Sequence, residues 1–172
     1  MKNLCLLIFT TAFFSVMTSL AQDDKSKRPS PPAKVTETIS SGATIMIDYS
    51  QPSLKGRTIG KDLAEYGKVW RTGANEATVF EVNKDVMVEG KALKAGKYAL
   101  FTIPGEAAWT VIFNKTAKQW GSFEYKQADD ALRVQVKPAK APAATEKMTF
   151  KIGKEGRVTL LWGATQVSFK VK

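Results

Sequence analysis

The chain has 172 residues, no histidine and one cysteine, and it carries 26 basic residues against 16 acidic ones, a formal net charge of +10. The missing histidines exclude a Ser-His-Asp triad and make a zinc site improbable, because histidine and cysteine are the usual zinc ligands. The basic residues are mostly scattered lysines, which indicates a solvated surface and no nucleic-acid partner, since phosphate recognition favours arginine.

The first 21 residues have the layout of a secretory signal peptide. A short positive region at Lys2 precedes an apolar run from residue 4 to residue 17, and small residues lead up to Ala21. The apolar run is shorter than the roughly 20 residues that a membrane-spanning helix needs. We therefore expect cleavage after Ala21, which removes Cys5 and leaves a mature protein without a transmembrane span, in the periplasm or outside the cell.

Residues 22–34 predict a flexible leader, because they are charged, contain three prolines and offer no large apolar side chain to a core. Residues 35–172 then form a single domain, which is long enough to bury a core without disulfides.

Apolar and polar residues alternate through most of this domain, which is typical of strands with one buried face. Residues 44–49, TIMIDY, place their apolar side chains on one face and Asp48 on the other. The segment 61–67, KDLAEYG, predicts the single helix of the domain, a short one that ends at its glycine.

The stretch 69–82, VWRTGANEATVFEV, predicts two strands, 69–72 and 77–82, joined by a turn. A loop is expected at 137–147. Further strands are predicted at 131–137, 147–152 and 167–172, and at 98–103, 109–113 and 158–162, whose continuous apolar runs indicate burial on both faces. A turn is expected at Gly163. Roughly ten short strands separated by turns indicate an all-β, antiparallel β-sandwich, with a distorted barrel as the second choice.

Four blocks, IDYSQPSLKGR, YGKVWRTGANEAT, AGKYALFTIPG and WTVIFNKTAKQWG, occur in this order along the domain. Together they resemble a bacterial family of exported proteins that is classed as domain of unknown function number twenty-nine eleven. The resemblance covers residues 35–172 and implies export from a Gram-negative cell, but it implies no activity. In that family an arginine usually stands at the position of Gln51, so the resemblance carries no cation to this position.

The first candidate site is the turn in residues 69–82. Trp70, Arg71, Asn75 and Glu76 offer a stacking face, a bidentate donor, an amide and a carboxylate within eight positions, and sites for sugars and carboxylates use such groups. The alternative is structural: Asn75 bonds the turn, Arg71 and Glu76 pair across a hairpin, and Trp70 covers the core.

Two further candidates follow from polar residues near strand ends. Trp120, beside Gly121, is either a ligand platform or a lid over one end of the core. Asp48 is either solvated or paired with Arg57 or Arg71 in an ion pair that fixes a loop.

We therefore expect a non-enzymatic module that binds a polar ligand, namely a glycan, a peptide or an anionic small molecule, with no cofactor and no metal. One alternative is a structural protein that contacts the cell envelope. The other is a carboxylate-based hydrolase, for which Asp48 and Glu76 are the available pair. The sequence contains no P-loop, nucleophile elbow or dinucleotide glycine motif.

Overall fold

The computed structural model describes residues 24–172, so the expected signal peptide and its cleavage site at Ala21 lie outside the described residues. Within this range the chain is built from strands and two short 3-10 turns, η1 (Lys25–Lys27) and η2 (Gln127–Asp129). The strands are β1 (Pro32–Thr38), β2 (Thr44–Ser50), β3 (Thr78–Val82), β4 (Val86–Val88), β5 (Lys91–Leu93), β6 (Gly96–Ile103), β7 (Trp109–Asn114), β8 (Asp130–Val136), β9 (Ala139–Ile152) and β10 (Arg157–Lys170).

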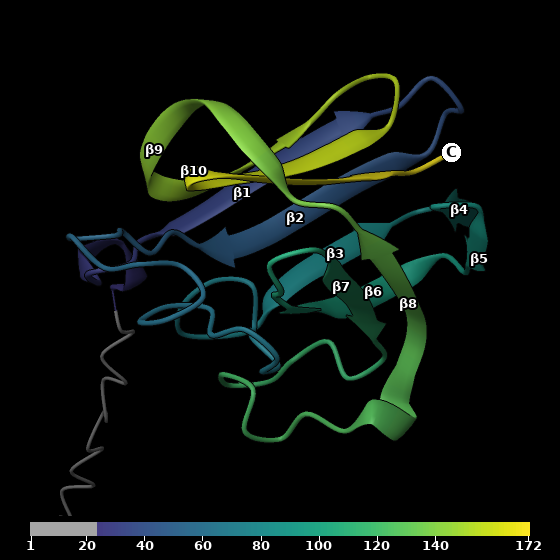
Figure 1. Ribbon diagram of the computed structural model, residues 1–172. Helices are drawn as coiled ribbons and strands as arrows, with labels where there is room; N and C mark the ends of the chain where they lie inside the picture. Colours follow the sequence, from purple (N-terminus) through teal and green to yellow (C-terminus); the bar gives the residue numbers. More distant parts are fainter. Residues whose placement is uncertain (1–23) are drawn as a thin grey trace, which may run out of the picture.

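Two layers of antiparallel strands make up the domain (Figure 1). The larger layer is a six-stranded sheet in the order β1-β2-β3-β6-β7-β8, and the smaller one is the long pair β9–β10. The short pair β4–β5 forms a separate hairpin, and its Val88 bridges Val171 at the end of the chain. This arrangement confirms the predicted β-sandwich, and the sheets do not close into a barrel.

The main core lies between the two layers. Its inward rings meet edge to face: Tyr49 on β2 contacts Phe150 on β9, with ring centroids 5.0 Å apart, and Phe113 on β7 contacts Phe169 on β10 at 5.7 Å. The alternation in β2 predicts this face correctly, because Tyr49 and the two isoleucines before it are buried. Burial of these apolar and aromatic side chains is the main stabilising contribution to the fold.

The outer face of the six-stranded sheet carries a second, smaller apolar cluster. Ala77, Ala99, Phe101 and Ile112 are buried there, and the ring of Tyr125 covers Phe101 at a centroid distance of 5.1 Å. β6 and β7 are therefore buried on both faces, as their continuous apolar runs predict. The loop after β7 provides this cover, and it also forms one wall of the site described below.

The predicted helix at 61–67 is wrong. Ala64 has φ +47°, which a right-handed helix does not allow, and the backbone N–H of Gly67 donates to Pro104 on another part of the chain. The segment forms consecutive turns, in which the N–H of Gly60 donates to the carbonyl of Leu63. Two turns of isolated helix are marginal in water, so these tertiary contacts determine the conformation.

The predicted strand at 69–72 is reduced to one bridge. Trp70 exchanges two backbone hydrogen bonds with Thr102 at the end of β6, and it does not pair with β3. Thr72 has φ +53°, which ends any extended run there. The residues before β3 therefore form a folded connection and not the first arm of a hairpin.

The expected loop at 137–147 and the two strands expected at 158–162 and 167–172 are also corrected. β9 starts at Ala139 and curls through this proline-containing segment (Figure 1), while β10 continues through the predicted turn at Gly163. Gly163 has φ +56°, and the β9–β10 register shifts on both sides of it. A glycine at this position lets the strand bulge and continue, instead of turning back.

The segment expected to be a flexible leader, 22–34, contributes to the structure from its described part onward. β1 begins at Pro32 and pairs along its length with β2, starting opposite Ser50. Before it, the 3-10 turn η1 contacts the domain through charged side chains.

Candidate functional site

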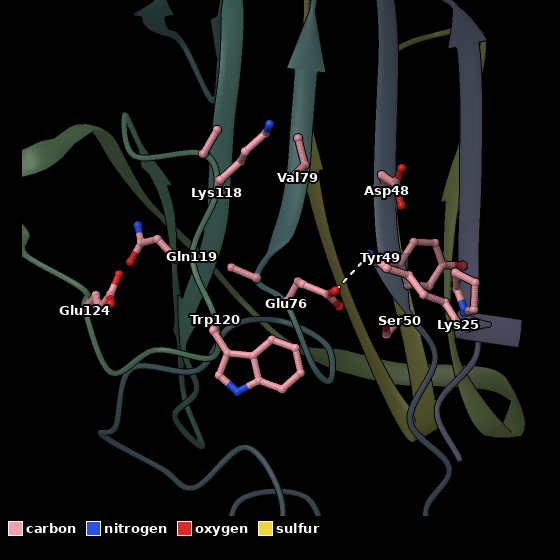
Figure 2. Close-up of a pocket in the computed structure, with 13 residues that line it drawn as sticks. Lys25, Asp48, Tyr49, Ser50, Glu76, Val79, Lys118, Gln119, Trp120 and Glu124 are labelled. Carbon is pink, nitrogen blue, oxygen red and sulfur yellow. Dashed lines mark hydrogen bonds and ion pairs between the residues drawn. The ribbon is translucent and has the colours of Figure 1, made fainter. Parts of the chain in front are cut away.

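A cleft of about 720 Å³ opens on the outer face of the six-stranded sheet, near the ends of β2 and β3. Its walls come from η1, β2, the start of β3 and the loop after β7. Figure 2 shows three of the lining side chains, Asp48, Glu76 and Trp120, around one opening. The cleft therefore joins segments that are far apart in the sequence.

Strand register determines which β2 and β3 side chains face the cleft. Asp48 lies opposite Val79, and both point away from the core because their neighbours Ile47 and Phe80 point into it. The Asp48 carboxylate forms an ion pair with Lys34 on β1 at 3.2 Å. Of the two alternatives for Asp48, the ion pair with Arg57 or Arg71 is thus replaced by a pair across two neighbouring strands, and the Asp48 side chain remains 46% exposed.

Glu76 stands at the entry to β3 and is held by two cations of the N-terminal segment. Lys25 Nζ donates to its Oε1 at 2.9 Å, and Arg28 donates to both carboxylate oxygens at 3.1 and 3.0 Å. Burial alone would raise the pKa of Glu76, but hydrogen bonds from Lys25, from its own backbone and from Arg28, with the charge of Lys25, lower this pKa to about 2. Glu76 is therefore ionised at neutral pH and donates no proton.

Trp120 forms the aromatic wall of the cleft. The loop places it opposite Glu76 in an antiparallel bridge, and the side chain remains 56% exposed. The guanidinium carbon of Arg28 lies 6.0 Å from the centroid of the Trp120 ring, within the range of a cation–π contact. Of the two expectations for Trp120, the structure favours an open aromatic surface over a lid on the core.

Gln119 anchors this loop from inside. Its Nε2 donates to Asn114 Oδ1 at 3.1 Å and to the carbonyl of Thr116 at 2.7 Å, and Asn114 in turn donates to Asp130. The Gln119 side chain is only 6% exposed, and its Oε1 is buried without a hydrogen-bond partner. A buried acceptor without a donor costs free energy, so the position of Gln119 depends on the two hydrogen bonds that its Nε2 donates.

Asn75 supports the site from behind. Its backbone has φ +59°, and its Nδ2 donates to the carbonyl of Ser30 at 3.1 Å and to Ser50 Oγ at 3.2 Å. The structural interpretation assigned Asn75 to its own turn, but these bonds reach the N-terminal segment and β2. Asn75 therefore ties three segments of the cleft together.

Three of the candidate residues lie away from the cleft. Trp70 is partly buried and packs against the core, stacked on Trp162 with centroids 5.5 Å apart, and it donates from its indole nitrogen to the carbonyl of Gly73. Arg57 is exposed and bonds the carbonyls of its own loop. Arg71 is half-buried, its Nε has no hydrogen-bond partner, and burial lowers the pKa of its guanidinium.

Sequence reasoning missed Lys25 and Arg28, the two cations that form ion pairs with Glu76. Both lie in the proline-rich segment, where composition argued for a solvated chain, and no periodic signal connects that segment with residue 76. Lys118 and Glu124, which also line the cleft, belong to the loop around Trp120. In the sequence, only their proximity to Trp120 pointed to Lys118 and Glu124.

Among residues 24–172, no group of three His, Cys, Asp or Glu side chains is placed to hold a metal ion. The same residues form no helix with the length and apolar character needed to cross a membrane.

The fold and the cleft define the class of protein: an antiparallel β-sandwich with an open, polar and aromatic cleft on the outer face of its larger sheet. Residues 30–171 match the family described as "Protein of unknown function (DUF2911)", and the chain belongs to that family. This match confirms the family that the four sequence blocks predict. The chain matches no curated protein and no solved structure.

Proposed function

We propose that the protein is a non-enzymatic binding module whose cleft holds a polar ligand between Trp120 and the carboxylates of Glu76 and Asp48. The observation that carries this proposal is the exposure of Trp120 at the wall of a cleft of about 720 Å³. An indole of this exposure costs hydration free energy in the free protein, and a ligand that stacks on it recovers this free energy. The polar lining supplies orientation, as in other sites for small polar ligands.

A hydrolase is the less favoured function for the same geometry. Asp48 and Glu76 do line one cleft, but the pKa of Glu76 is about 2 and its oxygens are engaged by Lys25 and Arg28. A glycosidase acid needs a raised pKa to hold its proton at neutral pH. Glu76 in this environment fits a charged anchor better than a proton donor.

The site of action that we propose is the periplasm or the exterior of the cell, on the strength of the first 21 residues of the sequence. N-terminal sequencing of the protein recovered from the periplasmic fraction tests this, with Gln22 as the expected first residue. Recovery of a chain that still begins at Met1 would contradict export by cleavage.

The binding proposal is tested by a thermal-shift and calorimetric screen of the mature chain against glycans, peptides and small anions. A ligand that binds the folded state raises the apparent stability by mass action. Trp120→Ala is expected to weaken any true hit at least ten-fold. Phe123→Ala is the matched control, because Phe123 is an aromatic residue of the same loop, 85% exposed and outside the lining of the cleft. Equal effects of the two changes would contradict the proposal.

A further inference from the structure

Cations of the chain itself occupy the face of the cleft formed by Glu76 and Trp120. Arg28 places one nitrogen against both Glu76 oxygens and its guanidinium carbon beside the Trp120 ring, while Lys25 adds an ammonium group at 2.9 Å. A carboxylate beside an aromatic ring is the combination that selects a guanidinium, since one group offers paired acceptors and the other a π-face.

The segment that carries these cations is fixed by backbone hydrogen bonds at one end and held by the side chains of Lys25 and Arg28 at the other. From Ser30 onward it is anchored, because Asn75 donates to the Ser30 carbonyl and the Gln51 N–H donates to Pro31. Toward the N-terminus it is a single 3-10 turn with no buried residue. The side chains of Lys25 and Glu76 are 57% and 40% exposed, so this ion pair contributes little stability. The Arg28 side chain, which is 19% exposed and bonds both Glu76 oxygens, makes the stronger contact. Because β1 is held separately by its pairing with β2, displacement of Lys25 and Arg28 leaves β1 in place.

The rest of the cleft favours a donor-rich, cationic partner. Glu124 and Asp48, the latter paired with Lys34, add two carboxylates to Glu76. Lys118 is the one cation that lines the cleft besides Lys25 among the described residues. With η1 displaced, the lining thus presents three acids against one base.

We propose that the cleft is a receptor for a guanidinium group, and that Lys25 and Arg28 are its built-in competitor, which a ligand in trans displaces. This inference rests on the proposed binding function and specifies its ligand class. A tethered group competes at a high effective concentration, on the order of millimolar for a short linker, so the apparent affinity for an external guanidinium is reduced in the intact protein.

The test compares the mature wild-type chain with the double variant Lys25→Ala/Arg28→Ala, which vacates the site. Two probes distinguish the source of the group: N-acetyl-arginine amide, a small guanidinium, and the peptide DKSKRPSP, which repeats residues 24–31. Isothermal titration is expected to show at least ten-fold tighter binding of the peptide to the double variant than to the wild type. Tight binding of both probes indicates a small-molecule source, and binding of the peptide alone indicates a protein ligand.

Two controls isolate the guanidinium. Lys27→Ala removes a neighbouring charge from a side chain that is 84% exposed and pairs with Asp24, so its binding should match the wild type. A peptide with citrulline in place of arginine keeps the shape and loses the charge, and it should bind at least ten-fold more weakly to the double variant. Adding Glu76→Gln to the double variant should abolish the gain.

The inference is overturned if the vacated variant binds the arginine peptide no tighter than the wild type does, or if the citrulline peptide binds equally well. Binding of an uncharged polar compound that depends on Trp120, without any guanidinium binding, would preserve the proposed function and remove this inference alone. If no compound shows binding that depends on Trp120, both the proposed binding function and the guanidinium inference are contradicted. Circular dichroism of each variant establishes that the sandwich is intact.

Discussion

Glu76 and Trp120 lie opposite each other in an antiparallel bridge, although 44 positions separate them in the chain. Two backbone hydrogen bonds flank the bridge: the Ala77 N–H donates to Gln119 at 2.9 Å, and the Gly121 N–H donates to Asn75 at 3.1 Å. The carboxylate and the indole are therefore positioned by main-chain pairing. Replacement of the Glu76 or Trp120 side chain should therefore leave the backbone of the site in place.

Replacement of Trp120 should separate binding from stability. The side chain is 56% exposed, so Trp120→Ala is expected to change the free energy of unfolding by less than about 1 kcal/mol, while ligand affinity falls at least ten-fold. Urea denaturation and calorimetry on the same preparation measure the two quantities. A large loss of stability would show that the indole belongs to the core.

Trp162 should show the opposite behaviour. It is 1% exposed, stacks on Trp70 and donates to the Glu146 carbonyl at 3.2 Å. Trp162→Ala is expected to destabilise the protein by about 3 to 5 kcal/mol, because a large buried ring is lost. The midpoint of urea denaturation measures this, with Phe123→Ala expected to stay within about 0.5 kcal/mol of the wild type.

Glu76 should make stability depend on acid pH. Its folded pKa of about 2 lies below the usual 4.5, so the stability contributed by its contacts is complete above pH 4.5 and is lost as the pH falls toward 2. Because the group is partly exposed, we expect roughly 0.5 to 1 kcal/mol. Unfolding free energies at several pH values should converge for wild type and Glu76→Gln near pH 2. Curves that stay parallel over this range would refute the assignment, and Glu124→Gln controls for loss of an acid in the same cleft.

Asn75 should stabilise the fold in two ways that can be separated, through its side-chain hydrogen bonds and through its tolerance of a left-handed backbone conformation. Asn75→Ala loses two side-chain hydrogen bonds and places alanine at φ +59°, a left-handed conformation that asparagine tolerates better, so we expect a loss of about 2 to 3 kcal/mol. Asn75→Gly loses the bonds but keeps the backbone conformation, and about 1 to 2 kcal/mol is expected. Chemical denaturation of both variants gives the comparison. Equal losses would mean that left-handed strain has no part in the role of Asn75.

The layered fold was accessible from sequence because alternation in β2 and the continuous apolar runs in β6 and β7 report burial directly. The errors occurred where tertiary contacts override local preference. The residues 61–67 have helix-type composition, but bonds to residues outside that segment determine their turns. Alanine and proline in residues 139–144 suggest a loop, yet pairing with β10 makes the segment a strand.

Part of the candidate site could also be predicted from the sequence, and part could not. Of the polar residues in 70–76, Glu76 lines the cleft together with Trp120. Sequence could not tell that Trp70 turns inward, because that depends on Trp162 from the far end of the chain. Nor could it assign Arg28 to Glu76, since an ion pair between distant segments leaves no periodic trace.

The smaller layer of the sandwich comes entirely from β9 and β10, the last two strands of the chain. Until those residues have left the ribosome, the rings of Phe80 and Phe113 have no opposing layer, and the apolar face of the six-stranded sheet is exposed to water. Folding of the sandwich therefore requires the final strand and depends on contacts between residues that are far apart in the sequence. Such folding is slow, and its intermediate exposes apolar surface that favours aggregation. A ribosome-bound or C-terminally clipped polypeptide would need a chaperone to stay in solution.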